Sequence, residues 1–373
     1  MDILRYCESQ KDLRKAELAA VLWLLQVPGV GPFRLRQWKL KHKTLIHVLH
    51  LMADSRYKSR QNLMAENASL KRVDEELRFL ERHGIQVYLW SDEDYPRRLK
   101  QCNDAPYLLF FKGSTPPEGE RIIAVVGTRS ATEKARRFTA ELLAGLAPYR
   151  PVIVSGLALG IDTAAHRAAL DLGLTTVAVV GHGLDRIYPA TNRNLAMEIL
   201  KQGGVLTEFP SGTKPDKPNF PRRNRIIAGL ADAVIVVETS ATGGAMITAR
   251  IAESYHREVF AVPGRPWESH TEGCNMLLRS HSAQILLDPE DVVRALHWDE
   301  LFAQQAVANR NHFPDLTPEE QEVVEFLKNH SPSHLEEIGL HCQQMPAQLA
   351  STLLNLEISG IIRALPGRRY ELA

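Results

Sequence analysis

The residues best suited to chemistry form one cationic segment near the middle of the chain, PSGTKPDKPNFPRRNRIIAGLA, which begins at Pro210. Up to Arg225 its only acidic residue is Asp216, and the aromatic residue Phe220 lies within it. Its five cations are Lys214, Lys217, Arg222, Arg223 and Arg225. Five cations and one anion give this stretch a net charge of +4. Cations bind phosphates with release of counterions, and an exposed ring can stack an unpaired base for about 1–3 kcal/mol. The segment therefore predicts a surface for single-stranded nucleic acid.

A purely structural role explains the same segment about as well. Phe220 could fill the core, Arg223 and Arg225 could form internal ion pairs, and the prolines could stiffen a loop. The residues alone leave both interpretations open.

Two glycine-containing turns could hold an anion. Gly127-Thr128-Arg129 follows the apolar run RIIAVV, where a dinucleotide-binding protein would carry G-x-G-x-x-G. Because those glycines are missing, the turn suits one phosphate better than a cofactor. Gly243 and Gly244 follow the run DAVIVVE. They could present N–H groups to an anion, or they could permit close packing of a helix on the sheet.

One pair of residues raises the question of catalysis. In SGLALGIDTAAH, which contains Ser155 and Gly156, Asp162 and His166 stand four residues apart on one helix face. General-base or metal chemistry would need further ligands or a nucleophile. We therefore predict a structural hydrogen bond between Asp162 and His166 and assign no catalytic residue. The four cysteines are far apart without a C-x-x-C motif, so we predict no metal site.

The elements that position these residues alternate between strands and helices. The runs RIIAVVG, PVIVSG, TTVAVVG, GVLTEF, DAVIVVE and EVFAVPG are separated by helical stretches. This alternation predicts βαβ units and a mostly parallel, Rossmann-like α/β sheet that is covered on both faces. Such sheets bind ligands at the carboxyl ends of their strands, where the cationic segment and the glycine turns begin.

The predicted domains are a helical domain over 1–83, the sheet core over 84–297, a linker over 298–314 and a winged-helix domain over 315–373. In the first, Val27-Pro28-Gly29-Val30-Gly31 resembles the turn of a helix–hairpin–helix or SAM-like module, which could contact either DNA or protein. The last has nine acidic and four basic residues, and its recognition-position helix PAQLASTLLNLEIS has no cation. A duplex reader needs cations, so we favour protein contact for it.

The bulk composition narrows the class of protein further. The net charge of +1 over 373 residues gives no general attraction to a polyanion, so binding must come from local charge. We find no apolar signal core and no run of about 18 apolar residues, and we expect a cytoplasmic protein without a membrane partner.

Eight motifs in order identify a family resemblance: GTR, SGLALGIDTAAH, TVAVVGHGLDRIYP, LTEFP, FPRRNRIIAGL, VETSATGGAMITA, REVFAVPG and EGCNMLL. Together they resemble the DNA-processing protein A (DprA/Smf) family of natural transformation, over about residues 84–287. Two departures stand out. SATEKARR follows Arg129 where a Tyr-Gly pair is usual, and LRSHSAQIL follows EGCNML where a Gly-Ala is usual.

The resemblance implies a non-enzymatic protein that binds incoming single-stranded DNA as a homodimer and protects it. It also implies loading of RecA recombinase past single-strand-binding protein, with no cofactor. For the single-strand surface, the resemblance implies Arg129, Lys217, Phe220, Arg222, Arg223 and Arg225. The full predicted surface adds Gly127, Thr128, Ser155, Gly156, Lys214, Gly243 and Gly244. The implied dimer surface consists of Met276, Leu277, Leu278 and Ile285.

Two other functions remain as alternatives. A nucleotide phosphoribohydrolase has a related core with P-G-G-x-G-T-x-x-E, but here Thr242 replaces its proline and Arg250 replaces its catalytic glutamate. A transcription regulator would act through the winged helix, which the acidic charge of that domain opposes.

Overall fold

The computed structural model describes residues 3–53, 70–299, 316–342, 344–359, 361–365 and 368–372. These residues divide into two units, 1–298 and 299–373, and each is described by itself. Most of the predicted linker, from residue 300 to 314, lies outside the described residues.

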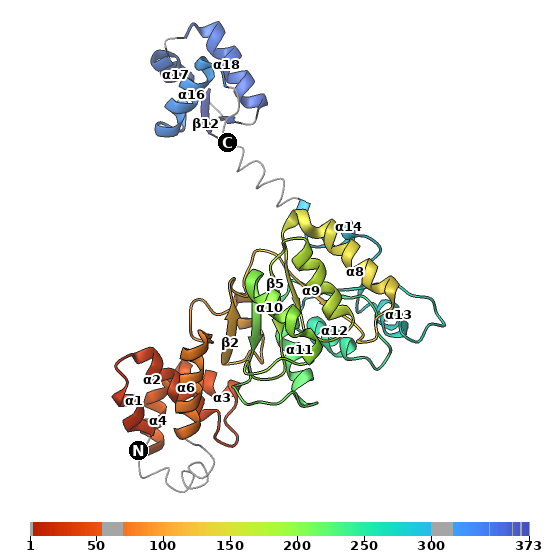
Figure 1. Ribbon diagram of the computed structural model, residues 1–373. Helices are drawn as coiled ribbons and strands as arrows, with labels where there is room; N and C mark the ends of the chain where they lie inside the picture. The colour runs from red at the N-terminus through yellow and green to blue at the C-terminus, as the bar shows by residue number, and fades with distance from the viewer. Residues whose placement is uncertain are drawn as a thin grey trace. The chain divides into compact units, whose positions relative to one another are not determined.

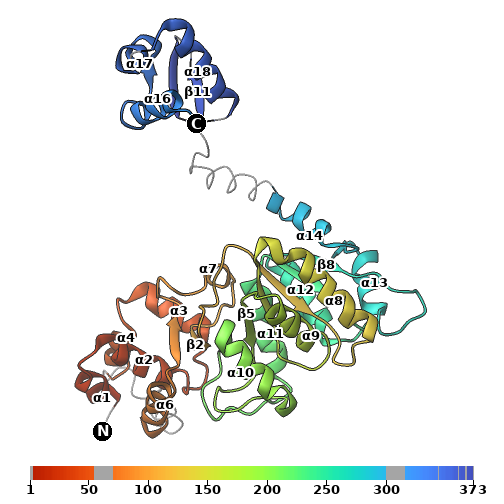
Figure 2. The ribbon, with the colours of Figure 1, turned by 45° about the horizontal axis from the view of Figure 1, so that its top comes forward.

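Helices open the first unit and pack beside the first two strands. The helices are α1 (Ile3–Ser9), α2 (Leu13–Leu24), α3 (Pro32–Lys41), α4 (Leu45–Ala53) and α6 (Leu70–His83), and the strands are β1 (Gln86–Leu89) and β2 (Leu108–Gly113). Asp12 caps α2 by accepting a hydrogen bond from the Arg14 amide. One hydrophobic cluster joins Leu24 and Leu77 of the helices to Phe110 of β2. Figures 1 and 2 both show α3 next to β2. The boundary at residue 83 remains a prediction, since this cluster spans it.

The sheet of the first unit contains nine strands within the described residues, in the order β1-β2-β6-β5-β4-β3-β7-β8-β9. The remaining strands are β3 (Ile122–Val126), β4 (Val152–Ser155), β5 (Thr176–Val179), β6 (Gly204–Thr207), β7 (Ala233–Val236), β8 (Glu258–Ala261) and β9 (Gln284–Ile285). Strands β3 to β9 pair in parallel, whereas β1 and β2 are antiparallel. All six predicted apolar runs form strands, which confirms the predicted mostly parallel core.

Helices cover both faces of this sheet (Figure 1). They are α7 (Arg97–Lys100), α8 (Glu133–Leu146), α9 (Ile161–Asp171), α10 (Arg193–Gln202), α11 (Asn219–Leu230), α12 (Gly244–Ser254), α13 (Glu272–Arg279) and α14 (Pro289–Ala295). Because side chains alternate along a strand, Val154 packs with α11 and α12 on one face. Its neighbour Ile153 packs with α8 and α9 on the other face.

The order in which successive strands are added to the sheet reverses at β3. Strands β4, β5 and β6 add on one side of β3, whereas β7, β8 and β9 add on the other. Ala124 is level with Val154 of β4 and Val234 of β7. In open α/β sheets, the crevice at such a switch point is where ligands bind.

The two edges of the sheet differ. At β1, the Arg14 guanidinium donates a 3.0 Å hydrogen bond to the Val87 carbonyl and pairs with Asp92 at 3.0 Å. At the opposite edge, β9 contains only Gln284 and Ile285, and both are exposed. A side chain therefore covers part of the first edge, and the second edge is short.

The second unit is the predicted winged helix. It contains α16 (Pro318–Asn329), β10 (Ser333–His334), α17 (Leu335–Cys342), α18 (Pro346–Ile358), β11 (Ile362–Leu365) and β12 (Arg369–Leu372). Thr317 and Glu320 form a reciprocal cap at the start of α16. Strands β11 and β12 pair antiparallel and form the predicted hairpin.

Candidate nucleic-acid interface

A pocket of about 330 Å³ lies at the switch point, beyond the carboxyl ends of β3 and β7. Its lining comes from the turn after β3, the loop after β7 and the start of α11. The lining residues include Gly127, Thr128, Arg129, Asp162, Phe220, Arg223, Asn224, Gly243 and Gly244. The fold thus brings together seven of the thirteen residues of the predicted single-strand surface, from three separate stretches of sequence.

The carboxylate of Glu238 fixes the turn that carries Arg129. Glu238 is buried just after β7, and it accepts hydrogen bonds from the Thr132 amide (2.8 Å) and hydroxyl (2.9 Å). Its own carbonyl accepts from the Thr128 amide at 2.7 Å. With the turn held at both ends, the exposed Arg129 side chain starts from a fixed main chain. Sequence reasoning missed Glu238, because a single carboxylate after a strand gives no signal of its target.

Aromatic rings and a guanidinium meet at the mouth of the pocket. The Arg129 guanidinium lies 5.3 Å from the centre of the half-buried Phe220 ring, a cation–π contact. The Tyr188 ring lies 6.0 Å from the Phe220 ring at an angle of 40°, and 44% of Tyr188 is exposed. Sequence reasoning missed Tyr188. Its signal was available, since it lies in the quoted motif HGLDRIYP after β5.

Arg223 and Ser155 are corrections to the predicted surface. Arg223 is only 5% exposed, and a Cβ placed on Gly156 would lie 1.5 Å from its Nη1 atom. Ser155 is fully buried and donates a 2.6 Å hydrogen bond to the Val125 carbonyl. Arg223 forms the inner wall of the pocket beneath Gly156, and Ser155 fixes β4 to β3. Neither side chain is exposed enough to lie along a polynucleotide.

Arg223 shares this interior with a carboxylate. Asp162 is also buried, and burial raises the pKa of its carboxyl group against the attraction of Arg223. Burial lowers the pKa of Arg223, which Asp162 opposes. The Nε atom of Arg223 has no hydrogen-bond partner among the described residues. Each group therefore favours the charged form of the other, against the cost of burial.

Arg225 is a further correction. It pairs with the buried carboxylate of Glu208 and donates to the Asp104 carbonyl, so its side chain is only 11% exposed. Burial raises the pKa of Glu208 despite this contact. Arg222 is 57% exposed, and it also lies within ion-pair distance of Glu208, at 3.8 Å. Its guanidinium lies 5.1 Å from the centre of the Phe209 ring.

The remaining predicted residues lie at the surface or at helix starts. Lys214 and Lys217 are exposed on the loop before α11. Gly243 precedes α12, and a Cβ there would lie 2.1 Å from the Thr239 hydroxyl oxygen, so this glycine is needed for packing. Gly244 has no atom within 4 Å of the same position, which leaves its main chain open toward the pocket.

The predicted Asp162–His166 hydrogen bond is wrong. The Nδ1 atom of His166 lies 2.7 Å from the Thr176 hydroxyl, whereas Asp162 accepts from the Ala158 amide at 3.2 Å. The Nε2 atom of His166 is buried without a partner among the described residues. The two side chains thus stabilise different strand ends.

His166 gives the chain a predictable acid sensitivity. Burial lowers its pKa from 6.5 to about 3, so the folded chain excludes a proton that the unfolded chain binds below pH 6.5. The free energy of unfolding should therefore decrease as the pH is lowered, by about 2 kcal/mol from pH 6.5 to pH 5. We expect His166→Asn to remove most of this slope in denaturant titrations at pH 7, 6 and 5. The exposed His281→Asn variant should keep the wild-type slope; equal slopes in all three proteins would contradict the prediction.

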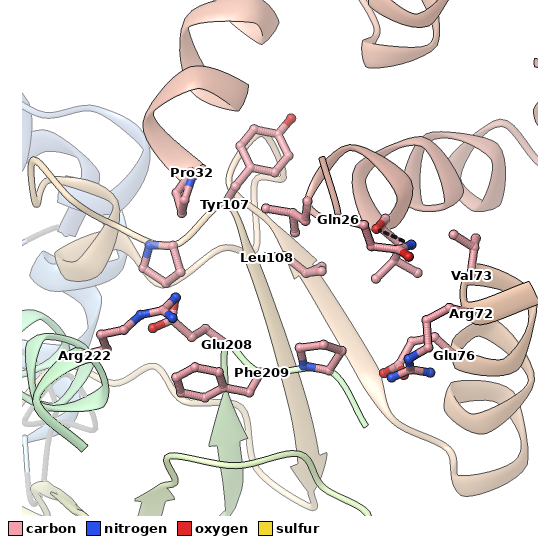
Figure 3. A pocket seen from close by; sticks show the side chains of 14 residues that line it. Gln26, Pro32, Arg72, Val73, Glu76, Tyr107, Leu108, Glu208, Phe209 and Arg222 are labelled. Carbon is pink, nitrogen blue, oxygen red and sulfur yellow. Dashed lines mark hydrogen bonds and ion pairs between the residues drawn. The ribbon is translucent and has the colours of Figure 1, made fainter. Parts of the chain in front are cut away.

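A second cavity, of about 280 Å³, lies between the N-terminal helices and the core (Figure 3). Pro32 at the start of α3 lines it together with Tyr107, Phe209 and Arg222 of the core. Figure 3 shows Arg222 next to Glu208, and Gln26 and Arg72 at the other end of the cavity. The N-terminal helices thus come close to the cationic segment, which the sequence did not predict.

The residues of the predicted dimer surface differ in their solvent exposure. Leu277 of α13 is only 4% exposed, whereas Ile285 of β9 is 51% exposed. Met276 and Leu278 are partly buried against the core. Leu277 is therefore a core residue, a correction to that prediction, and the dimer surface remains a prediction.

Neither a metal site nor a membrane span emerges from the residues with described positions. These residues contain no group of three or more His, Cys, Asp or Glu side chains that could hold a metal ion. No described helix has the length and apolar character needed to cross a membrane.

Comparison with known proteins decides the family. The model of DNA recombination-mediator protein A matches residues 86–297, and a DprA winged-helix model matches residues 311–368. The chain belongs to the DNA recombination-mediator protein A family. Protein Smf of Synechocystis is 33% identical over 94% of this chain and 98% of its own length. The family core thus coincides with the sheet that carries the pocket.

Solved structures from the family share the architecture. DNA processing protein A of Streptococcus pneumoniae superimposes with a TM-score of 0.65 at 31% identity, over 74% of this chain and 97% of that one. The Helicobacter pylori protein, studied for its single-stranded DNA binding mode, gives 0.51 at 32% identity, over 58% of this chain and 96% of that one. The family resemblance found in the sequence is thereby confirmed.

Proposed function

We propose that the chain binds single-stranded DNA across the pocket at the switch point and catalyses no reaction on it. The observation that carries the proposal is the contact of Arg129 with Phe220, 5.3 Å from guanidinium to ring centre, beside the partly exposed Tyr188. Cations beside an exposed aromatic surface suit an unpaired strand, because phosphates and base faces are reached together. The single-stranded DNA binding of the Helicobacter pylori relative supports the same ligand.

The residues proposed for direct contact are fewer than the sequence suggested. Phosphates are bound by Arg129, Lys214, Lys217 and Arg222, and bases stack on Phe220 and Tyr188. Gly127, Thr128 and Gly243 shape the pocket, and Gly244 admits the strand to its main chain. Gly156 is buried against Arg223 and is removed from the predicted surface. Arg223 and Arg225 hold α11 in place.

The enzymatic alternative lacks its acid. In a phosphoribohydrolase, the residue at position 250 would be a glutamate, but this chain has the exposed Arg250 on α12. The acidic residue that lines the switch-point pocket is Asp162, which is buried and accepts a hydrogen bond from the Ala158 amide. A hydrolytic role for this pocket therefore has no candidate general acid at its mouth.

The wider role that we propose is protection of incoming single strands in transformation and their transfer to RecA past single-strand-binding protein, by a homodimer. The family's description as a recombination mediator supports this role. In the winged helix, α18 carries no cation, and Leu354 and Ile358 are 56% and 77% exposed. An acidic domain with an apolar recognition-position helix favours protein over duplex DNA.

The proposal is tested by a salt titration of three ligands: an oligothymidylate, a duplex of equal length and a mononucleotide. We expect the single strand to bind most tightly, and Lys217→Ala to reduce the slope of log K against log salt by about 0.7, the value for one phosphate contact. The matched control is Lys201→Ala, on α10. Preference for the duplex or the mononucleotide would reject the proposal. RecA transfer is tested separately, by RecA assembly on strands covered with single-strand-binding protein.

A further inference from the structure

Helix α3 and the hairpin before it form an unusually basic part of the first unit. Residues 18–53 contain no Asp or Glu and have five cations: Arg34, Arg36, Lys39, Lys41 and Lys43. The net charge of the whole chain is only +1, so acidic residues elsewhere in the sequence balance the positive charge of residues 18–53. Local charge of this kind indicates a polyanion-binding surface.

The five cations divide into two inward and three outward side chains. Arg36 is buried and donates to the carbonyls of the 102–104 turn, and Lys39 pairs with Glu17 at 2.8 Å. Arg34, Lys41 and Lys43 are exposed, and none of them has an ion pair among the described residues. Three unneutralised cations thus face solvent from one short segment.

An aromatic ring and open main chain accompany these cations. Phe33 is 64% exposed next to Arg34 at the start of α3. Gly29 adopts φ +77°, where a side chain would be strained, and the Arg34 Nη1 atom lies 3.6 Å from the position that a Cβ would take there. A Cβ on Gly31 would meet no atom within 4 Å. The hairpin therefore presents main chain that a phosphodiester strand can approach closely.

The surface is fixed relative to the proposed DNA site. Arg36 of α3 donates to the Cys102 carbonyl at 3.2 Å and to the Asn103 carbonyl, and Arg225 of α11 donates to the next carbonyl, that of Asp104. Both helices thus donate hydrogen bonds to the carbonyls of the same three-residue turn, 102–104. Pro32 and Arg222 line the same cavity (Figure 3), so the start of α3 lies close to the DNA-facing part of α11.

We propose that the Val27–Gly31 hairpin and α3 form a second single-strand surface that continues the pocket site. Arg34 and Lys41 bind phosphates, and Phe33 stacks a base of the same strand as it passes Arg222. The inference rests on the proposed function, because it extends the path of that ligand.

Length dependence separates this surface from the pocket. We would measure binding of a ladder of oligothymidylates, from lengths that span only the pocket to lengths that also reach α3, for wild type, Phe33→Ala and Arg34→Ala/Lys41→Ala. The matched control, Arg136→Ala/Arg137→Ala on α8, removes the same charge from exposed positions. Unchanged melting temperatures would show that each variant is folded.

We expect short oligomers to bind all variants within about twofold of wild type. For long oligomers, Phe33→Ala should weaken binding at least about fivefold by loss of stacking. Arg34→Ala/Lys41→Ala should reduce the salt slope by about 1.4, the value for two phosphates. Wild-type behaviour of both variants at every length would overturn the inference while leaving the pocket site intact. Weaker binding to anionic lipid vesicles alone would assign the surface to a membrane instead. Failure of wild type to bind short oligomers would reject the proposed function itself.

Discussion

Replacement of Arg223 by methionine is expected to lower the free energy of unfolding by about 1–3 kcal/mol at neutral pH, because it removes the positive charge that favours the charged form of the buried Asp162 carboxylate. Asp162 and Arg223 are 6% and 5% exposed, and each shifts the pKa of the other toward its charged form. Without Arg223, Asp162 must either remain charged in the interior or take up a proton. Guanidinium chloride titration of the two proteins measures the difference.

Two variants separate charge from packing. Asp162→Asn/Arg223→Met removes both charges and should recover most of the lost stability, since an uncharged pair avoids the desolvation cost. Arg222→Met, one residue earlier on α11 and 57% exposed, should change stability by less than about 0.5 kcal/mol. If Arg222→Met and Arg223→Met proved equally stable, the buried pair would have no role in holding α11.

Phe220→Ala is expected to weaken oligothymidylate binding by about 1–3 kcal/mol with little change in salt slope, since stacking involves no counterion release. Arg129→Ala should also weaken binding, and it should reduce the slope by about 0.7. The guanidinium lies over the ring, so the two effects should not add. Isothermal titration at several salt concentrations, applied to both single variants and the double variant, measures the coupling.

The exposed Arg137→Ala variant on α8 is the control for a simple loss of charge. Its affinity and slope should stay close to wild type. A large slope change for Phe220→Ala, or strictly additive losses in the double variant, would contradict a shared surface of ring and guanidinium.

The strands and the position of the site could be predicted because both follow from local pattern. Near-continuous apolar runs such as IIAVV and AVIV become strands buried on both faces, and the glycine turns then fall at one edge of the sheet. The strand prediction depends little on tertiary structure, which is why it is confirmed, whereas the position of the site remains a prediction.

The roles of the arginines depend on helix geometry that the charge count ignores. Within α11, Arg223, Ile226, Ile227 and Leu230 are buried at spacings of three and four residues, so Arg223 belongs to the apolar face. Arg222 points away from this face. The helical period was readable in the sequence, but the density of positive charge suggested that all the cations face solvent.

Other contacts had no sequence signal. His166 and Thr176 meet because β5 lies beside β4, and the Glu238 carboxylate reaches Thr132 across the sheet edge. Arg36 donates hydrogen bonds to the Cys102 and Asn103 carbonyls, which lie 66 and 67 positions further along the chain. Spacing within one helix cannot reveal such partners.

The unequal edges of the sheet limit how copies of this chain could assemble through their strands. Arg14 occupies a carbonyl of β1, so a neighbouring backbone cannot add there without displacing it. Of the two edges of the nine-stranded sheet, the exposed β9 edge is the more open to such pairing. Two copies joined back to back through β9 would leave only their partly covered β1 edges, which favours a closed pair over a fibre.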